Sequence, residues 1–211
     1  MVGVLPDLLT RVENGLEMPF LLWRFATPLL AIASGPLGGG IGPRSWIINA
    51  TVPMSYDRDD PDIHLGSLAA GLGLTGAGLG FLTGVDVGRR VVRRDDGALV
   101  VATVGIGEAS WAAAAASAAP GVGTVNVFAF LPVRLSDAAL VNAVATVAEA
   151  KTQAFVELGY AGTGTATDAT CVLCPLDGLS ERYGGPRSTW GARLARAVHQ
   201  AVLVGDRPGL P

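Results

Sequence analysis

The feature that most constrains the fold is a long helix that stands between two apolar strands in the second half of the chain. Residues 123–131 (GTVNVFAFL) are typical of a buried strand, and residues 163–174 are a Thr/Gly-rich loop that enters another strand. Between them, Ser136 or Asp137 can cap the start of a helix that Gly159 ends. A strand, a helix and a strand in this order favour a sheet with a helix packed on one face.

A second pattern shows that the sheet is not purely parallel. Residues 87–92 and 98–104 flank Asp96-Gly97, which is a strong signal for a tight turn between antiparallel strands. Other strands are expected at 20–34, as two short strands around a turn, and at 45–52 and 81–87, and other helices at 65–80 and 189–204. These elements predict an α/β fold class: a single-domain layered fold with a mixed, partly antiparallel β-sheet flanked by helices. We expect one domain over residues 1–211, with a short Pro/Gly tail at 205–211.

The charge of the chain excludes several kinds of partner. It carries 15 basic and 18 acidic residues, a formal net charge of −3, so it offers no cationic surface to a nucleic acid. Two uncharged stretches, 65–85 and 109–133, are rich in glycine or interrupted by proline and lack the flanks of a membrane span. The N-terminal residues include acidic side chains, which do not suit a secretory signal. We therefore expect a cytoplasmic protein with no membrane partner.

Two motifs resemble metal or redox sites, but each has a simpler interpretation. Cys171 and Cys174 form a C-x-x-C pair inside an apolar strand-like stretch, and the chain lacks a second ligand pair for zinc. Residues 57–64 hold several aspartates and a histidine without the ligand order of a calcium loop. We interpret the cysteines as buried thiols and the acidic segment as a solvated loop, and we predict neither a metal nor a cofactor. The alanine-rich segment 107–121 is compatible with a helix or with a flexible cover.

The long helix carries a cation on its apolar side. At about 100° per residue, Lys151 falls within the same arc as five apolar residues, namely Leu140, Val144, Val147, Phe155 and Leu158. It is the only lysine, since every other basic residue is arginine. An ammonium that faces a core has to pair with an anion, reach solvent or lose its proton. Lys151 is thus a candidate general base or nucleophile; the alternative is a lysine whose stem packs while its head pairs or reaches water.

Polar loops bracket this helix at both ends. If the two flanking strands are neighbours in the sheet, five polar residues converge near Lys151: Thr124, Asn126, Thr165, Thr167 and Asp168. Glu149 lies on the opposite side of the helix and should face solvent, so a role for it would need a partner subunit or a local distortion. His199, in the last predicted helix, is expected on the surface.

These segments resemble one protein family. Residues 123–158 and 163–175 (TGTATDATCVLCP) are similar to the adenosylcobinamide amidohydrolases, the CbiZ type, of cobalamin salvage. Weaker similarity extends over about residues 20–203 and includes the strand with Asn49 and the segment around Thr83. The family pattern often has a histidine after the asparagine that Asn49 matches, where this chain has Ala50.

The resemblance implies hydrolysis of the amide that joins the aminopropanol arm to the corrin ring of adenosylcobinamide, giving adenosylcobyric acid. By position it implies catalytic roles for five residues: Asn126, Glu149, Lys151, Thr165 and Asp168. The substrate-binding set is expected to comprise Asn49, Thr83, Thr124, Gly164 and Thr167. The corrinoid is then the substrate, no cofactor is implied, and a homo-oligomer is compatible with the sequence.

The chemistry of such a substrate sets further expectations. A corrinoid is large and fringed with neutral amides, so it needs a broad pocket with scattered hydrogen-bond partners. The chain has no Gly-x-Ser-x-Gly or His-Glu-x-x-His motif. We therefore assign proton handling to Lys151, with Asp168, and an activated hydroxyl or water anchor to Thr165 or Thr167. Asn126 and loop amides would hold the oxyanion.

Two other functions are compatible with the same residues. The Gly/Thr loops could belong to a non-catalytic cytoplasmic module that binds a corrinoid or a nucleotide. Alternatively, cleavage at Gly123-Thr124 or Gly164-Thr165 would expose the N-terminal threonine of an autoprocessed amidase. Release of aminopropanol identifies a hydrolase, and an intact mass of 21.5 kDa excludes autoprocessing.

Overall fold

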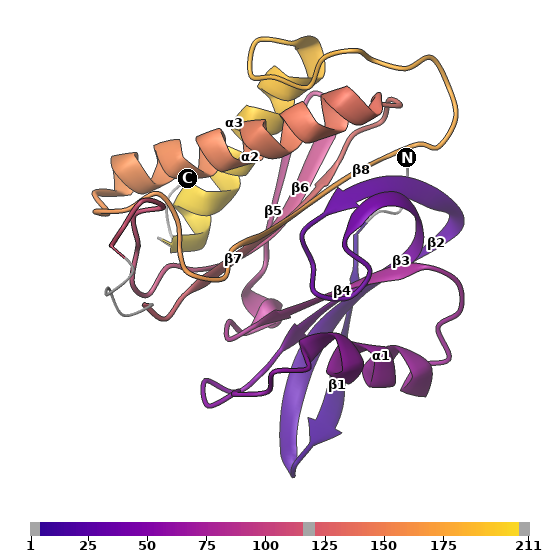
Figure 1. Cartoon of the computed structure of the whole chain (residues 1–211), viewed down its shortest axis with the longest axis vertical. Helices are drawn as coiled ribbons and strands as arrows, with labels where there is room; N and C mark the ends of the chain where they lie inside the picture. The colour runs from indigo at the N-terminus through magenta and orange to yellow at the C-terminus, as the bar shows by residue number, and fades with distance from the viewer. Residues whose placement is uncertain (1–4, 116–120, 207–211) are drawn as a thin grey trace.

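An eight-stranded mixed sheet and three α-helices are built by residues 5–115 and 121–206, which the computed structural model describes (Figure 1). In chain order the elements are β1 (Asp7–Glu13), β2 (Leu16–Ala33), β3 (Gly40–Thr51), α1 (Pro61–Gly71), β4 (Gly78–Thr83), a 3₁₀ turn η1 (Val87–Arg89), β5 (Val91–Asp95), β6 (Ala98–Gly105), β7 (Thr124–Phe130), α2 (Asp137–Leu158), β8 (Ala169–Cys174) and α3 (Thr189–Asp206).

The sheet contains both of the connections that the sequence predicts. Its strands follow the order β4-β3-β2-β8-β7-β6-β5, and β1 pairs with β2 off this path. The pairs β3/β4 and β7/β8 are parallel, and the other pairs are antiparallel. The hairpin is β5–β6, and the helix-connected strands are β7 and β8, which are neighbours. The predicted layered α/β fold with a mixed sheet is therefore confirmed.

The long strand β2 bends the sheet into two halves. Its residues 20–24 pair with the end of β3, and residues 30–33 pair with the start of β3 on one side and with β8 on the other. The register with β3 shifts between Arg24 and Leu29, and such an irregularity bends a strand. As a result, β3 and β4 lie over β6 and β7, and the two halves of the sheet form stacked layers.

Three buried clusters fill the spaces between these layers. One lies between helices α2 and α3 and one face of β6, β7 and β8. The second, rich in aromatic residues, lies between the opposite face of those strands and β2, β3 and β4. The third lies between the outer face of β2 and β3 and helix α1. Figure 1 accordingly shows α2 and α3 together on one side of the molecule and α1 on the other.

The local signals for α2 and for the hairpin are confirmed. The side chain of Ser136 accepts a hydrogen bond from the backbone of Ala139 at 3.1 Å, which caps the start of the helix. Gly159 ends it in the left-handed conformation, with φ of 85°. Asp96 and Gly97 both have positive φ, as a tight hairpin turn requires.

Other predicted boundaries are wrong. Residues 20–34 were expected to form two short strands, but they belong to one continuous β2, and β1 before it was not expected. The helix expected at 65–80 runs from Pro61 to Gly71, because proline suits the first helical turn and Gly73 takes a positive φ just beyond the end. The strand expected at 81–87 is β4, which is displaced toward the N-terminus.

The interpretation of the cysteines is confirmed. Both thiols are free and buried in β8, and they point to opposite faces of the strand. Burial raises the pKa of both thiols, which suppresses the reactive thiolate. Residues 107–115 of the alanine-rich segment contain no helix, and residues 116–120 lie outside the described part. In the part of the chain that the structure describes, no helix combines the length and the apolar character needed to cross a membrane.

Candidate active site

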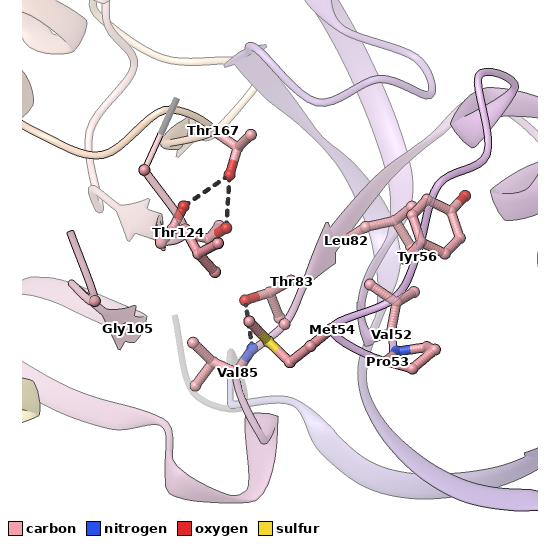
Figure 2. A pocket seen from close by; sticks show the side chains of 15 residues that line it. Val52, Pro53, Met54, Tyr56, Leu82, Thr83, Val85, Gly105, Thr124 and Thr167 are labelled. Atoms are coloured by element: carbon pink, nitrogen blue, oxygen red, sulfur yellow. Dashed lines mark hydrogen bonds between the residues drawn. The ribbon is translucent and has the colours of Figure 1, made fainter. Parts of the chain in front are cut away.

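An open pocket of about 460 Å³ lies where the two halves of the sheet meet at one end (Figure 2). The ends of β3, β4, β6 and β7 and the loops that follow or precede them supply its walls. The lining residues are Val52, Pro53, Met54, Tyr56, Leu82, Thr83, Gly84, Val85, Gly105, Gly107, Gly121, Val122, Gly123, Thr124 and Thr167. None of these described residues carries a formal charge, so the pocket suits an uncharged ligand.

The layer between the two halves of the sheet becomes polar as it approaches this pocket. Phe81 of β4 and Phe128 of β7 point into the aromatic cluster. Side chains two residues apart on a strand share a face, so Thr83 and Asn126, which lie closer to the pocket, point into the same layer. Asn49 of β3 is buried at the same level and donates to the hydroxyl of Thr103 at 3.2 Å. The predicted residues Asn49, Thr83 and Asn126 are therefore brought together beneath the pocket.

The amide of Asn126 has no hydrogen left for an oxyanion. Its Nδ2 donates to Asn49 Oδ1 at 2.9 Å and to the carbonyl of Leu82 at 3.1 Å. Only the NH₂ group can face a carbonyl oxygen, so the contact with Leu82 sets the orientation of this amide. In the described part of the structure, the buried Asn126 Oδ1 has no hydrogen-bond partner. This geometry does not support the predicted role of Asn126 as an oxyanion donor; the group it can offer is an acceptor.

Two threonine hydroxyls face the pocket as a connected pair. Thr124 Oγ1 and Thr167 Oγ1 are 2.6 Å apart, and Thr167 Oγ1 donates to the carbonyl of Gly123 at 2.9 Å (Figure 2). Because a hydroxyl has one hydrogen, Thr167 spends its own on Gly123, and Thr124 must be the donor between the two. The Thr124 oxygen keeps its lone pairs for a ligand or a water molecule.

Lys151 forms an ion pair with Asp168 directly behind this wall of the pocket. The Lys151 ammonium contacts Asp168 Oδ2, and both side chains are about nine-tenths covered, with exposures of 13% and 15%. The ammonium also lies over the ring of Phe155, 5.6 Å from its centre. Of the three outcomes that the sequence leaves open for this lysine, the structure shows pairing with an anion.

The carboxylate of Asp168 ties two loops together. Besides Lys151, it accepts hydrogen bonds from the backbone of Val125 at 2.8 Å and of Thr165 at 2.9 Å, and from the Thr165 hydroxyl. Four donors occupy the acceptor positions that a carboxylate offers. Asp168 thereby fixes the peptide group that follows Thr124, while Thr167 holds the carbonyl that precedes it.

Gly164 is required by the same ion pair. A Cβ at this position would stand 2.5 Å from Lys151 Nζ and 2.6 Å from Asp168 Oδ2. Both distances are shorter than real Cβ contacts, so a larger residue here would have to displace the ends of both side chains. The structure thus places Gly164, Thr165, Lys151 and Asp168 in one cluster behind the pocket, and Thr83, Thr124 and Thr167 in its wall.

Glu149 is not brought into either group. It is exposed on α2, as the helical wheel predicts, and it faces away from the Lys151–Asp168 pair. The catalytic role that the resemblance implies for it stays a prediction.

Sequence reasoning missed a charged network on the opposite side of the pocket. His64 was assigned to a solvated acidic loop, but it is buried in α1, where its Nε2 is 3.0 Å from Glu13 Oε1 and its Nδ1 is 3.1 Å from the hydroxyl of Tyr56. Tyr56 lines the pocket. The available signal was Pro61, which favours a helix start three residues before His64.

The fold and the pocket define a mixed α/β protein with a small-molecule site built from neutral hydroxyl, amide and backbone groups. Comparison with known proteins identifies the family to which the chain belongs. The model of the adenosylcobinamide amidohydrolase family matches residues 5–207, so the chain belongs to this family of hydrolases.

Two relatives agree with the family match. An adenosylcobinamide amidohydrolase of Methanosarcina mazei is 31% identical over 184 residues, which cover 83% of this chain and 88% of the relative. A protein of the same name from Halobacterium salinarum is 43% identical over 81 residues, 38% of this chain and 34% of its own length. No solved structure matches the chain.

Proposed function

We propose that this enzyme hydrolyses the amide between the aminopropanol arm and the corrin ring of adenosylcobinamide. The products are aminopropanol and adenosylcobyric acid, which serves corrinoid salvage in the cytoplasm. The family and the names of the two relatives support the substrate.

The observation that carries this proposal is the uncharged character of the pocket. Three threonine side chains and five glycines supply hydroxyls and exposed backbone, and no described lining residue is an acid or a base. A ligand fringed with neutral amides finds hydrogen-bond partners there without meeting a charge. Met54 and Val122 at the pocket are 69% and 59% exposed, so they offer apolar contact to a ring larger than the pocket itself.

We propose that the amide bond to be hydrolysed binds beside the hydroxyls of Thr124 and Thr167. Hydrolysis adds the oxygen of a water molecule to the amide carbon, and one hydrogen of that water ends on the departing nitrogen. The free lone pairs of Thr124 Oγ1 can accept that hydrogen from the water, and the Thr124 hydroxyl then turns its own hydrogen from Thr167 to the departing nitrogen. Backbone groups of the glycine loops lie next to the pair and suit the developing oxyanion.

Lys151 and Asp168 support this centre from behind. Neither side chain is among the lining residues, and the Asp168 carboxylate already holds four donors. This arrangement favours holding the peptide groups around Thr124 over the direct proton transfer that the sequence analysis assigned to the pair. The buried charges also set the electrostatic field at the Thr124 hydroxyl.

A product assay tests the proposed function. The wild-type protein is incubated with adenosylcobinamide, and free aminopropanol and adenosylcobyric acid are quantified. A hydrolase releases both in equal amounts over many turnovers. A protein that binds adenosylcobinamide and returns it intact is a carrier, and that result would overturn the proposal.

A further inference from the structure

A second polar network reaches the pocket from the edge of the sheet. It joins Arg11 and Glu13 of β1, His64 of α1 and Tyr56 of the loop between β3 and α1. The four residues come from three separate parts of the chain and meet at Tyr56, which lines both the main pocket and a smaller cavity of about 190 Å³ beside it. Nothing in the proposed chemistry at Thr124 uses this network.

The contacts in the network form a chain with a defined direction. Arg11 donates to Glu13 Oε2 at 3.0 Å and to the carbonyl of Thr51 at 2.8 Å, which fixes the carboxylate against the end of β3. Glu13 Oε1 lies 3.0 Å from His64 Nε2. The His64 ring stacks on Tyr56 with 5.6 Å between centroids, and its Nδ1 is 3.1 Å from the Tyr56 hydroxyl.

Glu13 decides which nitrogen of His64 carries the proton. Burial works to raise the pKa of Glu13, but the hydrogen bond from Arg11, its positive charge and the contact with His64 hold it below its ordinary value. Glu13 is then a carboxylate, so His64 Nε2 must be the N–H that faces it. In neutral His64 the other nitrogen, Nδ1, is an acceptor and takes the hydrogen of Tyr56.

The oxygen of Tyr56 therefore keeps lone pairs that can accept a hydrogen bond from a ligand. Burial, its largest influence, raises the pKa of Tyr56, which keeps the side chain a neutral phenol. Figure 2 shows the ring of Tyr56 beside Leu82 with its hydroxyl directed away from Thr83. The smaller cavity is lined by the carboxylates of Glu13 and Asp57, by Asn14 and Ser55, which both accept and donate, and by Arg58, whose guanidinium pairs with Asp60. The two carboxylates favour a part of the ligand that donates hydrogen bonds.

We infer that Tyr56 is a substrate-binding residue whose hydroxyl accepts a hydrogen bond from an uncharged N–H or O–H group of the substrate. His64, held by Glu13 and Arg11, is the positioning residue that keeps this hydroxyl in its accepting state. The inference rests on the proposed function. It places in the smaller cavity a part of the substrate whose amide groups donate hydrogen bonds.

Four variants test the inference through KM for adenosylcobinamide. His64→Leu removes the acceptor for Tyr56, whereas His64→Gln keeps an acceptor for Tyr56 and a donor for Glu13. Tyr56→Phe removes the hydroxyl and keeps the ring. His199→Gln is the matched control, because His199 forms the same kind of pair with Glu157, at 2.8 Å, between α3 and α2 and away from the pocket.

The expected pattern separates the variants. Tyr56→Phe and His64→Leu each raise KM about five-fold, as loss of one hydrogen bond predicts. His64→Gln and His199→Gln keep the wild-type KM. A Tyr56→Phe protein with the wild-type KM, or a His64→Gln protein with the raised KM of His64→Leu, would overturn the inference.

Two further provisions keep the outcome decisive. If a His64 variant does not fold, Tyr56→Phe alone decides, and an unchanged KM in that variant contradicts the inference. If the wild type releases no aminopropanol, the proposed function has failed. Equilibrium dialysis of adenosylcobinamide with the same variants then applies the same criteria to Kd.

Discussion

Gly164 shows how tightly single residues constrain the site. A methyl group there would meet the Lys151 ammonium and the Asp168 carboxylate at about 2.5 Å, and Asp168 cannot move because three other donors hold it. We expect Gly164→Ala to lower the free energy of unfolding by about 1–3 kcal/mol, the usual cost of overpacking. Turnover should fall with it, because the loops around Thr124 shift. Urea denaturation and the aminopropanol assay measure the two effects.

Gly66→Ala is the control for this change. Gly66 lies within α1, and a Cβ at that position has no neighbour within 4 Å. Alanine favours a helix over glycine by roughly 0.5–1 kcal/mol, so this variant should be slightly more stable and fully active. Gly164→Ala behaving like Gly66→Ala would show that the loop adapts and that the ion pair needs no glycine.

The sequence indicates the role of Lys151 but not the orientation of the Asn126 amide, because only the first depends on a local pattern. Lys151 stood out because a cation inside an apolar arc needs a partner, and the pair with Asp168 follows once β7 and β8 are neighbours. The orientation of the Asn126 amide depends on the carbonyl of Leu82 in a distant strand. No pattern along the chain contains that contact.

At the scale of elements, α2 delivers Lys151 to the two loops that flank it. We expect Lys151→Met to reduce turnover at least about 100-fold, because the peptide groups around Thr124 lose the support of Asp168. An unpaired, largely buried carboxylate should also cost up to about 3 kcal/mol of stability. Single-turnover rates and thermal unfolding measure the two losses. Near-normal turnover would exclude the lysine from any part in the reaction.

Glu149→Gln provides a comparison on the same helix. Glu149 is exposed and lies outside the cluster, so its loss should change turnover less than about two-fold, as for most surface substitutions. A large loss in this variant would favour the catalytic role that the family resemblance implies, acting through a surface that the single chain leaves open.

The contact between β5 and α3 predicts how stability depends on pH. The two hydrogen bonds from Arg196, both at 2.7 Å, hold the pKa of Asp95 below its ordinary value. A lowered pKa means that the unfolded chain binds the proton more readily, so the contribution is present near neutral pH and is lost as the pH falls through the acidic range. We expect Arg196→Ala to be slightly less stable than the wild type at pH 7, and the difference to shrink as the pH falls below the ordinary pKa of an aspartate. A constant difference across this range would contradict the assignment.

The elements differ in how well the sequence predicts them. Helix α2 and the β5–β6 hairpin carry their own caps and turn residues, so local patterns locate them. The continuity of β2 depends on simultaneous pairing with β1, β3 and β8, and the first turn of α1 depends on packing of His64 against β1. Such long-range contacts have no local signature.

At the scale of the whole molecule, folding of one sheet over itself creates the pocket. The aromatic cluster closes the space between the two halves at one end, and the pocket opens at the other end, where polar residues line it. The sequence predicted the threonine loops on the β7–β8 side. The opposite wall, with Met54 and Tyr56, follows only from the bend in β2, which carries β3 and β4 over β6 and β7.

The most direct test of this account replaces one oxygen. Thr124→Val keeps the shape of the side chain and removes the hydroxyl that faces the pocket. We predict that it binds adenosylcobinamide within about five-fold of the wild type, the value of one hydrogen bond, and releases aminopropanol at least about 100-fold more slowly in a single turnover. Wild-type release by this variant would place the chemistry elsewhere in the molecule.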